Sequence, residues 1–471
     1  MRESQLVNTY KKLVGNSLIF AIGNLGSKFI TFIMLPLYTY KLSTSEYGTT
    51  DVIQTTVMLL LPIVSLSIYD AVLRFAMDEK EEKSDIFSSG ILVSIIGVFI
   101  SLIVTLVMFS LNIPFSIFFF MLLTVQSFQN LTSQFCKAIG KVKLFAVNGI
   151  VLSFATALTN VLFLIVFEFG VFGYLWSIVA SNLLSIIFMV VVGRLYKYVD
   201  FRKINRDTIF RMLKFSVPLV PNSIAWWTSN TISRYFILYF LGASVNGLFA
   251  VANKIPTLLS VVNSIFFQAW QMTAIEEFES EDKDEIYSNT FNVYCQVLFL
   301  GSAVILAMIQ PLMSVLVSPK FYLAWEYVPF LLTTVIYSSL SGFLGQNYVA
   351  AKKTVGVLVT TIFGAVVNIL GNFILVPTMG AIGAGISSTI AFFVIWLVRM
   401  KDNKKFSNMK IDNKMFILNN ILIFSQIMSM YLLKGKAMYI SIIIHLLLIC
   451  VVNRHLLSIL TRYLKIRKVR M

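Results

Sequence analysis

A run of 24 residues, IFSSGILVSIIGVFISLIVTLVMF, occupies positions 86–109 and contains no charged side chain. A helix needs about 20 largely apolar residues to cross a hydrocarbon core of about 30 Å, so this run predicts a transmembrane helix. The whole chain is 58% hydrophobic and 13% charged, with a mean hydropathy of +0.82, whereas soluble domains carry about 25% charged residues. We therefore expect an integral membrane protein.

Thirteen further apolar runs accompany this one. Each is long enough to span a membrane, so the sequence predicts an all-α polytopic membrane protein with about fourteen transmembrane helices. The fourteen runs cover residues 13–40, 47–73, 86–109, 114–136, 144–167, 171–193, 213–241, 247–272, 289–317, 325–350, 354–377, 380–398, 415–433 and 437–460.

Basic residues are distributed unequally between the segments that connect these runs. Thirty of the 38 Lys and Arg residues fall in alternate segments that include both chain ends, and the opposite segments hold only Lys41, Lys320, Lys434 and Lys436. Because Lys and Arg are retained on the cytoplasmic side, we expect both termini in the cytoplasm and an even number of crossings. This retention explains the net charge of +16, so we expect no nucleic-acid partner.

The sequence offers no cluster of residues suited to catalysis or metal binding. The cysteines Cys136, Cys295 and Cys450 lie far apart in apolar runs, and His445 and His455 fall on different faces of one predicted helix. No position combines a nucleophile with a base, and the predicted outward loops are short. We therefore expect no catalytic residue, no metal site and no cofactor.

Weak internal repeats divide the chain. Two six-helix halves would have the same orientation, because six is even, and this parallel arrangement is found in many transporters. We expect a six-helix bundle in 1–200, a second in 201–405, and two additional helices with a basic tail in 406–471. The matching positions are Glu46-Tyr47-Gly48 and Val245-Asn246-Gly247, Gly170 with Gly173 and Gly380 with Gly383, and Asn160 and Asn368 with Asn372.

Polar residues interrupt several of the apolar runs. A charged side chain at mid-bilayer costs about 2.5–3.5 kcal/mol, so it needs a partner or a wet cavity. Helical spacing places such residues on one face of the first, seventh and eighth runs. The candidate substrate-binding residues are Asn24, Lys28, Trp226, Asn230, Arg234, Lys254, Gln268 and Trp270.

Three of these residues, Lys28, Arg234 and Lys254, predict a cationic cavity between the two halves. Cations in a partly desolvated cleft suit phosphate or pyrophosphate, and arginine can bind it through two parallel hydrogen bonds. The alternative for Lys28 is a side chain that reaches the membrane surface. Tryptophans such as Trp226 and Trp270 suit stacking on sugar rings, and equally suit a place in the core or at the membrane interface.

The second run carries three further charges. Asp51, near its predicted outer end, is a candidate for ion coupling, with a solvated surface carboxylate as the alternative. Asp70 and Arg74, at the predicted cytoplasmic end, are four residues apart. This spacing favours an ion pair that ties the helix to the following loop, and a gating role is the alternative.

Three local motifs resemble a known family. They are KLSTSEYG at 41–48, YDAVLRF at 69–75 and GLFAVANKIP at 247–256. With the topology, they resemble the polysaccharide transporters of the multidrug/oligosaccharidyl-lipid/polysaccharide exporter superfamily, which include O-antigen and capsule flippases. One position departs from the pattern: Ser233 stands before Arg234, where many relatives carry an acidic residue.

The resemblance implies a function and a location. The cargo would be an undecaprenyl-pyrophosphate-linked oligosaccharide, an O-antigen or capsule repeat unit, moved from the cytoplasmic to the outer leaflet of the bacterial inner membrane by alternating access. The basic residues would bind the pyrophosphate, while the polyprenyl tail stays in the membrane lipid. A polymerase and other membrane proteins of polysaccharide assembly are the expected partners.

Three other functions compete with this interpretation. A multidrug or cation exporter of the same superfamily would favour acidic groups in the cavity, whereas the mid-helix charges here are mainly basic. A membrane glycan polymerase would need acid or base groups on an outer loop, and the predicted outer loops offer few. A purely structural scaffold would leave the buried cations costly and without a use.

Overall fold

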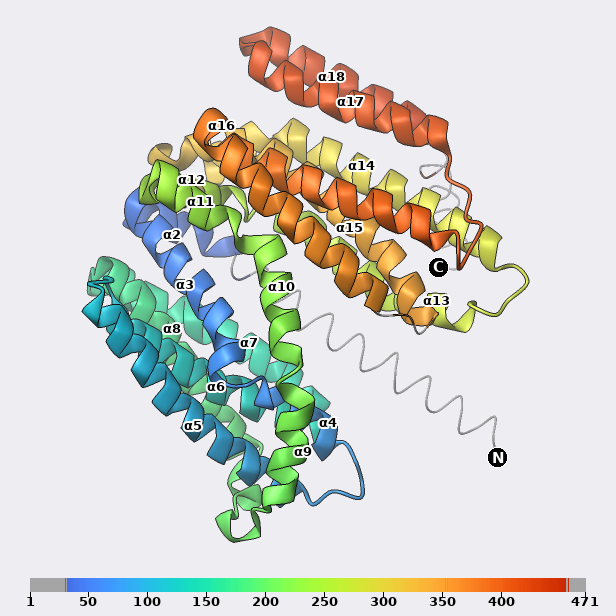
Figure 1. Ribbon diagram of the computed structural model, residues 1–471. Helices are drawn as coiled ribbons and strands as arrows, with labels where there is room; N and C mark the ends of the chain where they lie inside the picture. The colour runs from blue at the N-terminus through green and yellow to red at the C-terminus, as the bar shows by residue number, and fades with distance from the viewer. Residues whose placement is uncertain (1–29, 31, 352, 354, 455, 457–471) are drawn as a thin grey trace, which may run out of the picture. The chain divides into compact units, whose positions relative to one another are not determined.

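The computed structural model describes residues 30, 32–351, 353, 355–454 and 456, without the side chains of residues 268, 269, 272 and 276. These residues are mostly helical, so the predicted all-α fold is confirmed (Figure 1). They form two compact units with a boundary between Thr231 and Ile232. This boundary lies inside the seventh apolar run, and the division at 200/201 and 405/406 stays a prediction.

The first unit contains nine α-helices among its described residues, with a π-helical turn extending α7 and two short 3-10 helices after α8. Their bounds are α2 (Leu35–Lys41), α3 (Thr44–Val64), α4 (Ile68–Ala76), α5 (Lys83–Ser110), α6 (Ser116–Ala138), α7 (Val142–Asn160), η1 (Val161–Val166), α8 (Gly170–Val192), η2 (Leu195–Tyr198), η3 (Phe201–Lys203), α9 (Arg206–Ser216) and α10 (Leu219–Thr231).

The second unit contains eight α-helices among its described residues, and its last two form an antiparallel pair (Figure 1). The bounds are α11 (Ser233–Leu241), α12 (Ala243–Ala252), α13 (Pro256–Glu276), α14 (Lys283–Leu316), η4 (Pro319–Tyr327), α15 (Val328–Ala350), α16 (Val355–Asn403), α17 (Asn413–Leu432) and α18 (Gly435–Val452).

Nine helices in the described part of the chain are long and apolar enough to cross a membrane, or ten if the bent pair α12–α13 is one span. Four differences explain why the structure has at most ten candidate spans where the sequence predicted fourteen transmembrane runs. Run 13–40 lies mostly outside the described residues, and α6, in run 114–136, is rich in amide and hydroxyl side chains. Run 213–241 is divided among α9, α10 and α11, and runs 354–377 and 380–398 are the two arms of α16.

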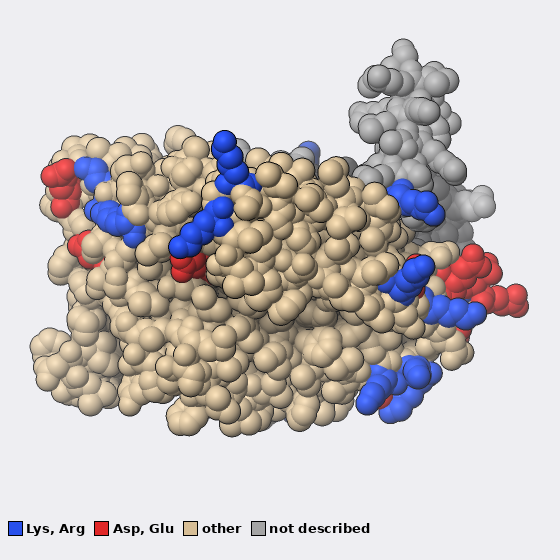
Figure 2. Space-filling view, turned by 90° about the horizontal axis from the view of Figure 1, so that it is seen from above, with Lys and Arg blue, Asp and Glu red and all other residues tan. Residues whose placement is uncertain are grey.

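Helix α5 illustrates how these helices suit a membrane. Small and polar residues such as Ser94, Gly97 and Ser101 are buried, whereas Phe99, Ile103 and other large apolar side chains are exposed. A Cβ at Gly97 would lie 2.8 Å from the carbonyl oxygen of Val64, so the glycine permits close approach of α3 and α5. Figure 2 shows a broad surface of uncharged side chains on which charged side chains form a few small groups. Lipid rather than water suits such a surface.

The first of the three motifs that resemble the family, residues 41–48, includes the start of α3. The Ser43 hydroxyl accepts from the Glu46 backbone N–H at 3.2 Å, and the Glu46 carboxylate accepts from the Ser43 N–H at 2.8 Å. This capping box satisfies two backbone donors and fixes the helix start. Nearby, Lys41 pairs with Glu168 at 2.9 Å and lowers the pKa of that carboxylate.

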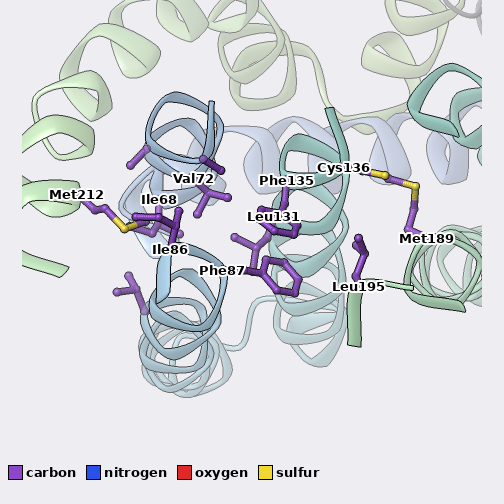
Figure 3. Packing of buried hydrophobic residues seen from close by; sticks show 13 residues of the cluster. Ile68, Val72, Ile86, Phe87, Leu131, Phe135, Cys136, Met189, Leu195 and Met212 are labelled. Atoms are coloured by element: carbon purple, nitrogen blue, oxygen red, sulfur yellow. The ribbon is translucent and has the colours of Figure 1, made fainter. Parts of the chain in front are cut away.

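The interior of the first unit holds a cluster of apolar side chains at the ends of α4, α5, α6 and α8 (Figure 3). Phe87 and Phe135 stack with ring centroids 4.2 Å apart, and the side chains of Cys136 and Met189 point toward each other (Figure 3). Met212 contributes from α9. The packing therefore draws α9 into the first unit, although α9 follows the six helices predicted for that half.

Equivalent turns occur in the two units. Gly170 and Gly380 both have positive φ, +54° and +66°, which glycine adopts without strain. Three residues later, a Cβ at Gly173 would lie 2.9 Å from the Phe163 carbonyl oxygen, and one at Gly383 would lie 2.2 Å from that of Leu375. Each turn thus packs a helix against the one before it, and α16 is a hairpin with two arms.

In both units, similar hydrogen bonds join the two helical segments on either side of this turn. Ser177 donates to the side-chain oxygen of Asn160 at 3.0 Å in the first unit, and Ser387 donates to that of Asn368 at 3.0 Å in the second. Asn372 also donates to Ser387, at 3.1 Å. The asparagines and glycines that matched in the sequence therefore occupy matching structural positions.

A second pair of matching contacts fastens the start of α5 and of α14, which begin 200 residues apart at Lys83 and Lys283. Asp85 accepts from Thr208 at 2.7 Å and from the Asn205 N–H at 3.2 Å. Asp284 accepts from Ser407 at 2.7 Å and from the Asn408 N–H at 2.9 Å. In each unit, an acidic residue at a helix start thus holds the segment that follows a predicted run, the sixth run in the first unit and the twelfth in the second.

Candidate substrate-binding site

The two predicted cations that the structure describes lie at breaks in helices. Arg234 is the second residue of α11, after the break that ends α10 at Thr231, and it is half-buried. Lys254 is half-buried and lies between α12 and α13, where the helix axis bends by 46°. The other predicted cation, Lys28, lies outside the described residues together with Asn24.

The motif at 247–256 explains the second break. Pro256 is the first residue of α13 and has no N–H to continue the helix from α12. Asn253 donates to the Phe249 carbonyl at 2.8 Å and ends α12. Broken helices expose backbone donors, and in membrane proteins they are tolerated where they line a cavity or are covered by protein. At the break, the backbone N–H groups of Lys254 and Leu258 are paired: they donate to the carbonyls of Val251 and Ile255, each at 3.0 Å.

The tryptophans fall into two environments. Trp226 is 60% exposed, and its carbonyl accepts from Asn230 at 2.8 Å. Its neighbour Trp227 is buried and donates its indole N–H to the Thr55 carbonyl at 2.9 Å, which holds α10 on α3. Trp226 and Asn230 therefore present open polar and aromatic surface in the first unit.

Trp270 has a different role in this structure. It is 2% exposed, and its ring stacks on Phe343 with centroids 4.3 Å apart and meets Tyr287 edge-on at 5.0 Å. These contacts place Trp270 in the aromatic core of the second unit, the alternative that the sequence left open. The side chain of Gln268, the remaining candidate on this helix, lies outside the described residues.

Asp51 lies in a polar aromatic cluster of the first unit. It is half-buried in α3 and close enough to Tyr174 of α8 for electrostatic interaction. Gln54 donates to the Tyr174 hydroxyl at 2.6 Å, and the Tyr174 ring meets that of Tyr38 edge-on at 5.1 Å. This environment is more enclosed than that of a solvated surface carboxylate.

Asp70 and Arg74 lie on α4 but do not form the expected pair. Asp70 is half-buried and Arg74 is exposed, and no ion pair joins them among the residues that the structure describes. The loop after α4 is instead held through acids of that loop: Glu81 pairs with Arg211, and Glu82 pairs with Lys203 at 2.5 Å. These exposed pairs join the α4–α5 connection to the segment after α8.

Sequence reasoning missed one buried cation, Arg399. It is 5% exposed in α16 and donates to Thr360 at 2.9 Å, to the Ser341 carbonyl at 2.8 Å and to Thr361 at 3.1 Å. The sequence assigned it to a cytoplasmic basic segment because the apolar run ends at residue 398, yet α16 continues to Asn403. The hydroxyl-rich pair Thr360-Thr361 and the small Gly345 were the available signals.

Two curated relatives share part of this sequence. Protein 1 of the Lsg locus of Haemophilus influenzae is 24% identical over 57% of this chain, and an uncharacterized membrane protein of Methanocaldococcus jannaschii is 22% identical over 56%. The chain spans 66% and 56% of the length of these relatives, less than two thirds in each case.

Solved structures share the fold along most of the chain. The lipid II flippase MurJ in its inward closed conformation has a TM-score of 0.68 at 13% identity, covering 96% of this chain and 99% of that one. An inward-facing multidrug resistance MATE family transporter of the MOP superfamily gives 0.65 at 14% identity, over 86% and 98%. A MOP superfamily transporter from Pyrococcus furiosus gives 0.60 at 15%, over 88% and 95%. At these identities, the likeness shows the fold alone.

The protein is thus a multi-pass membrane protein whose fold is that of the solved MOP superfamily structures. The sequence model described as "Polysaccharide biosynthesis protein" matches residues 13–271, more than half of the 471-residue chain. The chain belongs to the polysaccharide biosynthesis protein family.

Proposed function

We propose that the protein is a flippase for a lipid-linked oligosaccharide. The observation that carries this proposal is the presence of two half-buried cations, Arg234 and Lys254, at helix breaks in a membrane protein of a polysaccharide biosynthesis family. Half-buried cations at helix breaks suit a phosphorylated head group better than an uncharged or cationic cargo. The cargo is an undecaprenyl-pyrophosphate-linked O-antigen or capsule repeat unit.

Each candidate residue has a proposed role. Lys28, Arg234 and Lys254 bind the pyrophosphate, with Arg234 engaging two oxygens through its planar guanidinium. Trp226 stacks on a sugar ring, and Asn24, Asn230 and Gln268 donate to sugar hydroxyls. We assign Trp270 to the aromatic core, because Phe343 already covers its ring.

The proposed mechanism is alternating access between two parallel six-helix repeats, with two additional helices and both termini in the cytoplasm. Support comes from the matching turns at Gly170 and Gly380 and the matching acids Asp85 and Asp284. In this scheme about fourteen helices cross the bacterial inner membrane. The polymerase that extends the repeat units would act on the product at the outer surface.

Transport by the purified protein tests this proposal directly. Proteoliposomes would contain the protein and a pyrophosphate-linked oligosaccharide on a short polyprenol, with the sugars initially inside. A membrane-impermeant glycosidase added outside should release sugar only when the protein is present. Vesicles without protein set the background, and equal release from both preparations would contradict the proposal.

Asp51 is the proposed site of ion coupling, with Asp70 and Arg74 in gating. The enclosed position of Asp51 beside Tyr174 and Gln54 favours a carboxylate that gains and loses a cation. Replacing Asp51 by Asn keeps the size but removes the charge, so transport should lose its response to an imposed proton or sodium gradient. Gradient-dependent rates in the same vesicles measure this response, and an unchanged response would remove Asp51 from the coupling role.

A further inference from the structure

A cavity of about 570 Å³ lies in the second unit where α14, α17 and α18 meet. It is distinct from the residues assigned to substrate binding and contains none of them. Lys414, from the first turn of α17, and Arg454, just beyond the end of α18, line it together with Asn292 and Gln296 of α14. Cations from two chain segments therefore meet uncharged amides from a third.

The amide wall of this cavity is fixed by hydrogen bonds. Asn292 accepts from the Asp412 N–H at 3.0 Å and donates to the Lys410 carbonyl at 3.1 Å. Gln296 is buried, and its side-chain oxygen accepts from the Leu456 N–H at 3.0 Å. These contacts hold the connection before α17 and the segment after α18 against α14, so the cavity has a defined shape.

The charge of the lining is positive. Asp412 is its one acid, and the Asp412 carboxylate already accepts from the Met415 N–H at 3.0 Å as the cap of α17. Within the described part of the chain, neither Lys414 nor Arg454 forms an ion pair. Both cations are exposed and can therefore turn toward an anion in the cavity.

The remaining wall is apolar and continuous with a lipid-facing surface. Leu418 and Val451 line the cavity and are 38% and 65% exposed. Exposed apolar residues continue from there along both membrane-spanning helices, at Ile421, Leu447 and Leu448. A ligand that fits has a phosphate for the cations and hydrocarbon for the helix surface.

We propose that this cavity binds the head group of an anionic membrane phospholipid. The phosphate lies between Lys414 and Arg454, the amides of Asn292 and Gln296 contact the glycerol and head-group oxygens, and the acyl chains run along α17 and α18. Basic pockets between transmembrane helices bind anionic lipid head groups in this way. The proposal does not depend on the identity of the transported cargo.

Lipid binding can be counted by native mass spectrometry of the full chain, released from nanodiscs of phosphatidylcholine with increasing phosphatidylglycerol of the same acyl chains. We expect one tightly bound phosphatidylglycerol in the wild type, and an affinity at least about tenfold weaker in the Lys414→Gln/Arg454→Gln variant, which loses two charge-assisted contacts. The Lys414→Arg variant keeps the charge and should retain binding.

A matched control neutralises two cations at the other end of the same helical pair. Lys434→Gln/Lys436→Gln changes the net charge equally and should leave phosphatidylglycerol binding unchanged, because Lys434 precedes α18, Lys436 is its second residue, and both are exposed. Equal losses in the two double variants would mean general charge attraction and would overturn the site. Displacement of the lipid by millimolar inorganic phosphate would also overturn it, since it would identify a free-anion site.

Discussion

Replacing both Arg234 and Lys254 by alanine should abolish glycan export while leaving the protein inserted in the membrane. Each hydrogen bond to a charged group contributes about 1.5–3 kcal/mol, so two cations lost from one pyrophosphate should weaken binding by more than about 100-fold. Both residues lie at helix breaks and not within the buried core, so the helices around them should still pack. Surface glycan measured with an antibody or lectin reports export, and membrane fractionation reports insertion.

Conservative variants separate binding geometry from charge. Arg234→Lys keeps the charge but loses the planar fork, so export should fall only in part. Lys434→Ala/Lys436→Ala removes two exposed cations and should leave export unchanged. Full export by the Arg234→Ala/Lys254→Ala variant would remove both residues from substrate binding, and loss of the protein from the membrane would assign them to folding instead.

The general fold was predictable because membrane helices leave a strong signal in the sequence. Uncharged runs of 20 or more residues, such as 86–109, identify α5, and the matching glycines identify equivalent turns in both units. The breaks were harder to predict. Hydropathy is continuous over 213–241, yet the chain forms α9, α10 and α11 there, because Pro218 and Pro221 and the packing of α10 on α3 interrupt one long helix.

The candidate site was predictable only in its residue types. Side-chain spacing selected Arg234 and Lys254, and the structure places both at helix breaks, which periodicity alone did not indicate. Spacing could not separate Trp226, which is exposed, from Trp270, which an aromatic core covers, because both occur in apolar runs. Arg399 escaped notice because its partners come from α15 and the other arm of α16, far away in the sequence.

Loss of the protein should leave the lipid-linked oligosaccharide fully assembled but confined to the cytoplasmic leaflet. The physical reason is that the residues proposed to bind substrate are suited to holding an anion and not to breaking a bond: Arg234 and Lys254 are cations, and Asn230 and Trp226 are neutral. A deletion strain should therefore lack surface glycan and accumulate intact lipid-linked repeat units. Extraction of polyprenyl-linked glycans, with and without prior digestion of intact spheroplasts by an impermeant glycosidase, measures both amount and leaflet.

The same experiment distinguishes translocation from polymerisation, the competing enzymatic function. If the protein were a polymerase, the deletion strain would display single repeat units on the outer leaflet, where the glycosidase would remove them. If it is a flippase, the accumulated units resist digestion until the membrane is opened. Expression of the wild-type chain should restore surface glycan, and the Arg234→Ala/Lys254→Ala variant should reproduce the deletion phenotype, because in the proposed mechanism binding of the pyrophosphate precedes every later step of translocation.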